Sequence, residues 1–254
     1  MKQSTDSVLG LDIGGSAIKA APVDVDSGRL LSDPQQFPVP DRVTPDVLLT
    51  AVGSCLSRFK WTGPLGVGYP GVVKSGHTLS AAHVDDSFIG LDWLAQLRTL
   101  TDSSVALLND ADAAGLAEIH FGAGAAHAAS DDKTVLVMTL GTGIGTALFR
   151  SGQLFPNTEF GHVQMGEAEA EDQAAAAIRI KDQLDWPQYG RRVNRFLVEM
   201  ERLLSPDLFI IGGGISENFD KFSACLDVRA EVVPAALGNN AGLIGAALAV
   251  RLAG

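Results

Sequence analysis

One pattern occurs twice in this chain: an apolar strand, a Gly-rich loop, a second strand and then a Ser-Gly turn. The first copy runs from Asp12 to Ser27, and the second runs from Thr139 to Ser151. Solenoid repeats recur about every 20–50 residues, whereas these two copies lie much further apart in the sequence. The spacing therefore indicates a duplicated domain. It predicts an α/β protein of two lobes, each of which offers one Gly-rich loop to a shared cleft.

The two loops, Gly14–Ser16 and Gly141–Gly143, have glycines where a phosphate would approach the backbone. Glycine allows a tight turn and places no Cβ in the way, and the exposed N–H groups of such a turn form an anion cradle. An ordinary hairpin turn favours glycine equally. Neither loop has the spacing of a P-loop or of a Rossmann dinucleotide loop. The loops are candidate phosphate-binding elements of another kind.

The stretch Val105–Asp112 has polar residues at the junction between a strand and a helix. Val105–Leu108 is an apolar run typical of a short buried strand, and a helix-forming run, Ala111–Phe121, follows. Asn or Asp at this junction can cap the helix, but capping needs one such residue, and Asn109, Asp110 and Asp112 are all present. We therefore interpret Asp110 as a general base that accepts a proton from an attacking hydroxyl group.

A third glycine run follows another buried strand. Leu208–Ile211 is apolar, and Gly212–Gly214 comes directly after it. Ligands of α/β proteins lie at the carboxyl ends of strands, so these glycines are a candidate donor-binding loop. A flexible turn before a helix at Ser216 is nearly as good an interpretation.

The composition excludes several classes of function. The chain has 254 residues, of which 46% are hydrophobic, so a packed core is expected. A net charge of −11 argues against generic binding of nucleic acid or of a membrane surface, although a few local donors can still hold an anionic substrate. The only cysteines, Cys55 and Cys225, predict reduced thiols and no zinc cluster. With no signal peptide or membrane span in the sequence, we expect a cytoplasmic protein.

The remaining periodicities predict further elements. A helix from Pro45 to about Lys60 would begin at the N-cap Thr44 and bury a stripe formed by Val47, Leu48, Ala51, Val52, Cys55, Leu56 and Phe59. We also expect a strand over Leu30–Phe37, a surface loop over Ala123–Asp132, and helices over Glu169–Lys181, Pro187–Leu204 and Ala241–Leu252. The expected lobes are residues 1–109 with 241–254, and residues 110–240.

Taken in order, the motifs resemble those of the ROK sugar kinases, which have the actin/hexokinase-like (ribonuclease H-like) fold. The resemblance extends over nearly the whole chain and is greatest to the branch that uses polyphosphate to phosphorylate glucose. The chain has no cysteine between Cys55 and Cys225 and so lacks the Cys-rich zinc motif of most ROK proteins, as that branch does. The motifs are Asp12-Ile-Gly-Gly-Ser16, Asn109-Asp110, Thr139-Leu-Gly-Thr-Gly143, Glu159-Phe-Gly-His162 and Ile211-Gly-Gly-Gly214.

The resemblance implies a role for each motif in a transfer of phosphate to glucose, with Mg²⁺ as the cofactor. Asp110 would be the base, and Asp12 would position Mg²⁺. The other implied sugar-binding residues are Asn109, Glu159, His162, Glu171 and Gly71. The implied phosphate-binding residues are Asp12, Gly14, Gly15, Ser16, Lys19, Thr139, Gly141, Thr142 and Gly143, and the implied donor-binding residues are Gly212, Gly213 and Gly214. A homodimer is also implied.

These residue types suit that chemistry. Phosphoryl transfer depends mainly on positioning and on stabilisation of charge, which a base, N–H cradles and Mg²⁺ supply. Glu, Asn and His side chains offer donors and acceptors that discriminate sugar hydroxyls. For His162, a core histidine bonded to backbone is the competing interpretation. Its place three residues after Glu159, on a segment without regular periodicity, favours the sugar-binding role.

Some features leave the donor and the sugar open. His83 and Tyr69 depart from the residues usual in the family near the sugar, so glucose and mannose are both possible substrates. Glu217 stands where relatives that use polyphosphate often have lysine. A glutamate there would repel polyphosphate more than a compact magnesium nucleotide, and so favours ATP as the donor. The candidates for a basic strip are Lys19, Arg179, Lys181, Arg191, Arg192 and Arg195. An ATP-dependent hexokinase, a non-catalytic sugar-binding regulator and an actin-like ATPase are the alternatives, and the intact Asp110 disfavours the regulator.

Overall fold

A computed structural model describes residues 7–40, 42–82, 84–128 and 130–253. The chain divides into two compact units. The first unit consists of the chain up to Ala117 together with the segment from Asn240 onward. The second unit is Glu118–Asn239. The helix that begins at Asp110 therefore contributes to both units, whereas the expected boundary lay in front of this helix.

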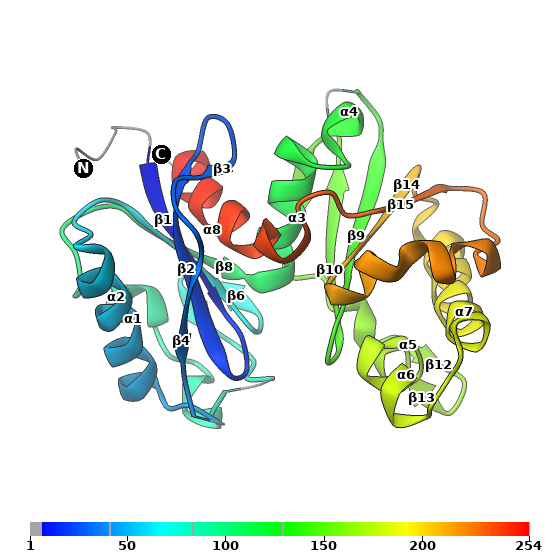
Figure 1. The fold of residues 1–254 in the computed structure, drawn as a ribbon, viewed down its shortest axis with the longest axis horizontal. Coiled ribbons are helices and arrows are strands. Elements are labelled where there is room, and N and C mark those ends of the chain that lie inside the picture. The colour runs from blue at the N-terminus through cyan, green and yellow to red at the C-terminus, as the bar shows by residue number, and fades with distance from the viewer. Residues whose placement is uncertain (1–6, 41, 83, 129, 254) are drawn as a thin grey trace. The chain divides into compact units, whose positions relative to one another are not determined.

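The first unit contains a six-stranded sheet in the order β3-β2-β1-β5-β8, with β4 also paired to β2 (Figure 1). Strand β1 is antiparallel to β2 and parallel to β5, which is parallel to β8. The strands are β1 (Ser7–Ile13), β2 (Ala17–Asp24), β3 (Arg29–Leu30), β4 (Gln35–Pro38), β5 (Leu65–Tyr69) and β8 (Val105–Asn109).

The second unit contains a five-stranded sheet in the order β11-β10-β9-β14-β15. Strand β9 is antiparallel to β10 and parallel to β14, which is parallel to β15. The strands are β9 (Thr134–Leu140), β10 (Ile144–Arg150), β11 (Gln153–Phe155), β14 (Leu208–Gly212) and β15 (Glu231–Pro234). The order and directions match those of the first sheet, so the duplication expected from the two Gly-rich hairpins is present.

In the first unit, helix α1 (Pro45–Phe59) packs one apolar face on the sheet. The helix begins after Thr44, as expected, but no side-chain hydrogen bond of Thr44 caps it, and it ends at Lys60 in a left-handed conformation. Within the expected stripe, Leu48, Val52, Cys55 and Leu56 are buried. Val47 is 43% exposed, so its place in the stripe was wrong. The short helix α2 (Trp93–Arg98) adds two buried side chains to the same core.

Helix α8 (Ala241–Leu252) packs on β1, β5 and β8 by close approach of backbone to backbone. A Cβ on Gly66 would lie 1.9 Å from the carbonyl oxygen of Ala246, and one on Gly10 would lie 2.1 Å from that of Leu243. Gly10 and Gly66 are paired across β1 and β5. The expected apolar terminal helix is therefore confirmed, and glycines on the sheet are what let it pack so closely.

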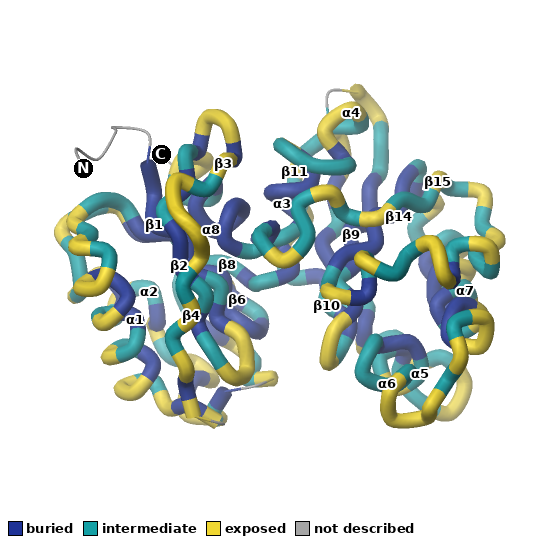
Figure 2. The backbone as a smooth tube through the Cα atoms, in the orientation of Figure 1, coloured by how far each residue is buried: buried dark blue, intermediate teal, exposed yellow. Residues whose placement is uncertain are grey.

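In the second unit, helix α7 (Trp186–Leu204) covers the sheet with large side chains. It begins with a capping box between Asp185 and Gln188. Its buried face meets Phe209 and Ile211 of β14 in a core that also holds Phe222. Figure 2 shows the central strands β9 and β14 largely buried, whereas the edge strands β11 and β15 are half-buried or exposed.

Three expected elements, a strand, a loop and a helix, differ from what the structure shows. The strand expected over Leu30–Phe37 was wrong as one strand: Leu31 still donates its N–H to the carbonyl of Pro22 at 2.8 Å, but Ser32–Pro34 leaves the ladder before β4. Pro22 of β2 and Pro34 carry no N–H, so neither can donate to the ladder here. Helix α4 (Ala125–Ala128) occupies part of the loop expected over Ala123–Asp132.

The helix expected over Glu169–Lys181 is divided into α5 (Glu171–Ala174) and α6 (Ala176–Lys181). Ala175 between them is extended, with ψ at 151°. The break lets the N–H of Ala177 donate to the carbonyl of Gly141 at 3.0 Å, which ties α6 to the Gly-rich loop.

Short elements complete the two units. Helix α3 spans Asp110–Phe121. The other short strands are β6 (Val73–Lys74), β7 (His77–Thr78), β12 (Gln164–Met165) and β13 (Ala168–Glu169). The 3-10 helices are η1 (Asp86–Phe88), η2 (Phe160–His162), η3 (Gly214–Lys221), η4 (Ser223–Cys225) and η5 (Gly238–Asn240). Across the described ranges, no helix combines the length and the apolar character that crossing a membrane requires.

Candidate active site

In the first unit, the predicted catalytic residues gather at one edge of the sheet. Strands β1, β5 and β8 are parallel, so their carboxyl ends lie together. Asp12 pairs with Gly68 near the end of β5, and Tyr69 pairs with Asn109 at the end of β8. Asp110 follows directly as the first residue of α3. The sequence prediction that these residues lie at strand ends is confirmed.

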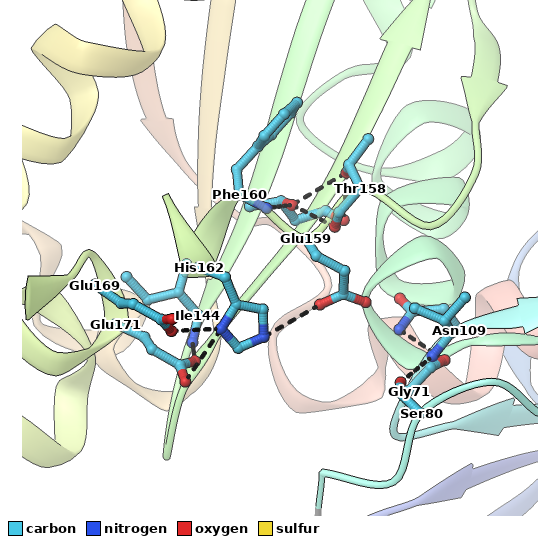
Figure 3. A network of polar contacts seen from close by, with 12 residues as sticks. Gly71, Ser80, Asn109, Ile144, Thr158, Glu159, Phe160, His162, Glu169 and Glu171 are labelled. Carbon is cyan, nitrogen blue, oxygen red and sulfur yellow. Dashed lines mark hydrogen bonds and ion pairs between the residues drawn. The ribbon is translucent and has the colours of Figure 1, made fainter. Parts of the chain in front are cut away.

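Asn109 is buried and connects two segments of this edge (Figure 3). Its side-chain Nδ2 donates to the carbonyl of Gly71 at 3.1 Å. Its Oδ1 accepts the N–H of Asp112 at 2.9 Å, which caps α3. Capping is thus the work of Asn109. The carboxylate of Asp110 is half-buried, and its Oδ1 accepts the N–H of Ala111 at 2.8 Å.

Gly71 is held against Ser80 in the loop after β5. A Cβ on Gly71 would lie 2.8 Å from the carbonyl oxygen of Ser80, so no side chain fits there. The hydroxyl of Tyr69 donates to the same carbonyl at 3.0 Å, and burial raises the pKa of Tyr69. Tyr69 is therefore a core residue that shapes this loop, and its side chain is fully buried. His83, the other departure from the family, lies outside the described residues.

Asp12 has the environment of a carboxylate that would hold a cation. Burial raises the pKa of Asp12, and its cross-strand neighbour Lys19 lowers it in part. A Cβ on Gly242 would lie 2.9 Å from both Cγ and Oδ2 of Asp12, so only glycine leaves room for the carboxylate. Mg²⁺ is commonly held by one or two carboxylates together with substrate phosphates, and a desolvated carboxylate at a strand end fits that pattern.

The two Gly-rich loops close their turns in similar ways. Gly14 donates its N–H to the carbonyl of Ala17 at 3.0 Å, and Gly141 donates its N–H to the carbonyl of Gly143 at 3.0 Å. The N–H of the first glycine is therefore used within each loop. Gly14, Gly15 and Ser16 are exposed, as are Gly141 and Thr142.

In the second unit, the phosphate loop and the donor loop lie at neighbouring strand ends. Thr139 of β9 pairs with Gly212 of β14. A Cβ on Gly213, which has φ of 80°, would lie 2.5 Å from the carbonyl oxygen of Leu140. Gly213 also accepts the hydroxyl of Ser216 at 2.8 Å. The structure brings these two predicted loops together, and glycine at position 213 is required by both the backbone conformation and the contact.

The predicted sugar-binding residues of the second unit form an acidic cluster around His162 (Figure 3). His162 Nδ1 lies 2.7 Å from Glu169 Oε2 and 3.7 Å from Glu171 Oε1. Its other nitrogen, Nε2, lies 4.0 Å from Glu159 Oε2. The competing interpretation of His162 as a core histidine was wrong, because its side chain is 55% exposed and carboxylates surround it.

The cluster changes the protonation of its members. The hydrogen bond to Glu169 is the largest effect and raises the pKa of His162; burial lowers this pKa, and the charges of Glu171, Glu169 and Glu159 raise it further. Burial raises the pKa of Glu159, Glu171 raises it further, and His162 lowers it. Because Glu169 occupies Nδ1, the Nε2 atom is the one that remains for a ligand. Ligand atoms of His162, Glu169 and Glu171 lie within 4.8 Å of one another, and these residue types can bind metal ions. In this structure, however, Nδ1 of His162 is engaged by Glu169.

Glu171 links this cluster to the phosphate loop. Its Oε2 accepts the N–H of Ile144 at 3.3 Å. The same oxygen would lie 2.6 Å from a Cβ on Gly143. The lack of a side chain at Gly143 therefore lets a carboxylate rest against the loop.

Sequence reasoning missed three residues of these sites. Glu169 holds His162, Gln173 ties the β12–β13 hairpin to α7, and Gly242 makes room for Asp12. Glu169 lies seven residues from His162 across a hairpin that the sequence pattern did not predict. Gly242 stands at the start of an apolar helix, where a glycine is expected only to allow close packing.

Comparison with known proteins identifies the family. The sequence model described as "ROK family" matches residues 8–177. A polyphosphate glucokinase of Mycobacterium tuberculosis is 45% identical over 242 residues, which cover 95% of this chain and 90% of that protein. The chain belongs to the ROK family.

Solved structures confirm the fold of this ROK protein. The crystal structure of an inorganic polyphosphate/ATP-glucomannokinase from Arthrobacter sp. strain KM matches with a TM-score of 0.91 and 40% identity, over 98% of this chain and all of that one (100%). A ROK family glucokinase from Streptomyces griseus, solved with glucose and AMPPNP, matches with a TM-score of 0.81 and 22% identity, over 96% and 99% of the two chains. The expected actin/hexokinase-like α/β fold is confirmed.

Proposed function

We propose that this ROK protein is a glucokinase that transfers a phosphoryl group from inorganic polyphosphate to the 6-hydroxyl of glucose. The observation that carries the proposal is the 45% identity to a polyphosphate glucokinase over 95% of the chain. The site geometry agrees with it, since Asp12 and Asp110 lie at the carboxyl edge of one sheet and a sugar-binding type of cluster lies in the other unit.

Asp110 is the proposed general base. It stands at the first position of α3, and Asn109, by capping that helix, fixes the backbone on which Asp110 is mounted. A carboxylate accepts the proton of the sugar hydroxyl as that oxygen attacks the terminal phosphoryl group. The proton moves to the Asp110 carboxylate, and the bond from the phosphorus to the leaving phosphate breaks.

Asp12 is the proposed residue for Mg²⁺. When bound, Mg²⁺ neutralises phosphate charge that develops during transfer. The chain's own contribution is a carboxylate whose raised pKa reflects burial and which Gly242 leaves room for. Gly15, Ser16, Thr142 and Gly143 are the proposed phosphate-binding backbone, together with Lys19 and Thr139.

The proposed sugar contacts are Asn109, Glu159, His162 and Glu171, with the backbone of Gly71. Buried or half-buried carboxylates and an oriented imidazole discriminate hydroxyl positions, because an analogue without the matching hydroxyl leaves them unpaired. Glucose is the proposed substrate. Mannose is the second candidate, since the Arthrobacter structure is of a glucomannokinase.

ATP is the second candidate donor, and a specific observation favours its inclusion. The same Arthrobacter protein is an inorganic polyphosphate/ATP-glucomannokinase. In this chain, Glu217 is exposed on η3, directly after the donor loop. A carboxylate there opposes a long polyanion more than a compact magnesium nucleotide.

Further features belong to the same proposal. We expect a cytoplasmic homodimer, with Cys55 and Cys225 present as free thiols. The dimer rests mainly on the family resemblance, and C2 dimers are also the commonest symmetry of soluble oligomers. A monomer mass by light scattering at micromolar protein would refute it.

The test is a coupled assay for glucose 6-phosphate on enzyme freed of bound polyphosphate, with polyphosphate and ATP supplied separately. We expect turnover with polyphosphate, and loss of turnover when Mg²⁺ is chelated. Turnover with ATP but not with polyphosphate would overturn the donor assignment and would leave the assignment as a glucose kinase intact. No turnover with either donor, while glucose still binds, would support the sugar-binding regulator instead.

A further inference from the structure

A shallow groove of about 560 Å³ runs along helix α7 in the second unit. Three of its six lining residues are the arginines Arg191, Arg192 and Arg195, and the others are Leu184, Gln188 and Asn194. Arg191 and Arg195 are one helical turn apart, about 6 Å along the axis. The sequence offered these three arginines among its candidates for a basic strip, and the structure places them in one groove.

The arginines differ in how firmly they are held. Arg192 donates to Asp182 at 2.7 Å and to the carbonyl of Gln173 at 3.4 Å. Arg195 donates to the side-chain oxygen of Gln173 at 3.0 Å. Within the described residues, no hydrogen bond or ion pair engages the exposed Arg191. The groove thus holds two oriented guanidinium groups and a third that is open to a ligand.

The local charge is opposite to that of the chain. The protein carries a net charge of −11, with 19 basic residues among 254. On α7, three arginines and no acidic residue lie between Trp186 and Val198. Asp182 is neutralised by Arg192, and the Asp185 carboxylate accepts the N–H of Gln188 in the capping box. The groove is therefore a positively charged site on an acidic protein.

The lining chemistry suits phosphate oxygens. The planar guanidinium fork matches phosphate geometry and stays charged at all physiological pH values. None of the described residues that line this groove is aromatic. Binding of single-stranded nucleic acid, by contrast, relies on aromatic platforms for the bases. A chain of phosphates without bases is the polyanion that this lining fits.

The groove is also tied to the sugar-binding cluster of the same unit. Gln173, which orients Arg192 and Arg195, donates its side-chain N–H to the carbonyls of Met165 at 2.7 Å and Ala168 at 3.1 Å. Those carbonyls belong to the β12–β13 hairpin that carries Glu169, the partner of His162. The arginines are thus built onto the scaffold of the site.

We propose that the arginine groove of α7 binds a stretch of the inorganic polyphosphate chain away from its reacting end. The proposal rests on the proposed function for the identity of the polyanion, and it deepens that function by naming the surface that holds the donor. Long chains would then bind more tightly than short ones, since only a long chain can occupy the groove while its reacting end lies at the phosphate loop of the same unit.

The test uses the variant Arg191→Gln/Arg195→Gln in the full chain. We expect the dissociation constant for long-chain polyphosphate, measured in the absence of glucose, to rise about tenfold, with the KM for polyphosphate rising in step. In the single variant Arg191→Gln, which leaves the hydrogen bond between Arg195 and Gln173 in place, the kcat and the KM for glucose should stay unchanged. The affinity for tripolyphosphate should change little. The slope of log affinity against log salt should become shallower by about one for each arginine removed.

The matched control is Arg202→Gln. Arg202 lies on the same helix but outside the groove and pairs with Glu199. This control should leave polyphosphate affinity unchanged. Unchanged affinity in the double variant, or an equal loss in the control, would overturn the groove assignment. Because binding is measured directly, a wild-type protein that binds polyphosphate at the groove but does not turn it over would refute the proposed donor and not this site.

Discussion

The two units share one sheet topology but place their functional residues differently. In the first unit, strand β1 ends near Asp12 and β8 ends at Asn109-Asp110. In the second unit, the corresponding strand β9 ends near Thr139, and β15 ends at Pro234 before Ala235. Among the described ends of these corresponding strands, carboxylates therefore stand in the first sheet and not in the second. In the second unit, the clustered carboxylates Glu159, Glu169 and Glu171 follow strands β9, β10 and β11 in the sequence.

The packing of the two sheets differs as well. In the first unit α8 lies against bare glycine backbone, whereas in the second unit α7 meets the sheet through aromatic and large aliphatic side chains. Tyr189 and Phe222 lie edge to face, with ring centroids 5.6 Å apart. The difference teaches that a duplicated scaffold can keep its strand order while its two copies differ in how a helix packs on the sheet and in where carboxylates stand.

The largest effect should come from removing the base of the first unit. We expect Asp110→Asn to lower kcat by about 10²–10⁴, the usual contribution of a general base. The measurement is steady-state turnover with saturating glucose and donor. Asp102→Asn, the same change at an exposed residue before β8, should leave kcat near the wild-type value. Near-normal turnover in Asp110→Asn would remove the base assignment.

The glycine packing of the first unit predicts a loss of stability. Gly66→Ala would place a methyl group 1.9 Å from the carbonyl oxygen of Ala246, and overpacking of this kind costs about 1–3 kcal/mol or more. Gly53→Ala on α1 is the matched control, since its nearest contact is 3.8 Å away, and it should be neutral or stabilise by up to about 1 kcal/mol. Urea unfolding of both variants measures the difference. Equal stability of the two would contradict the backbone-to-backbone packing of α8.

A smaller effect should appear in the second unit when Glu169 loses its charge. Glu169 raises the pKa of His162, so Glu169→Gln should lower that pKa, which NMR titration of the imidazole measures. Because the folded-state pKa is raised, the pair stabilises the β12–β13 hairpin below the usual histidine pKa. This contribution is lost as the pH rises through the raised value. Glu171 and Glu159 also face His162 and should keep part of the shift.

Glu167→Gln, on the same hairpin but exposed, serves as the control and should leave the titration of His162 unchanged. An unaltered pKa in Glu169→Gln would show that Glu169 does not hold the imidazole in solution.

The smallest effect concerns the donor. Glu217→Lys should lower the KM for polyphosphate, by about threefold for an exposed charge, and should change any KM for ATP less. Asp33→Lys, an equal change of charge at an exposed residue of the first unit, separates local from overall electrostatics. An equal response to both donors would place Glu217 away from the path of the polyanion.

The sequence was sufficient for what depends on periodicity and on glycine. The paired hairpins predicted the duplicated sheets, and the junction at Asn109 predicted a strand end followed by a helix. It was insufficient where tertiary contacts decide. Ala175 breaks a run that local propensity favours as one helix, because Ala177 bonds to Gly141. Glu169 could not be found either, since its role depends on a hairpin that folds it back onto His162.

The central claim is that Asp110 acts as the base while Glu159 holds the sugar, and glucose binding to variants of these two residues tests it most directly. Calorimetry should give Asp110→Asn a glucose dissociation constant within about threefold of the wild type, because the base acts mainly in the transition state. Glu159→Gln should weaken glucose binding by about tenfold or more, through loss of a charged hydrogen bond. The reverse result, with binding lost in Asp110→Asn and retained in Glu159→Gln, would contradict the account.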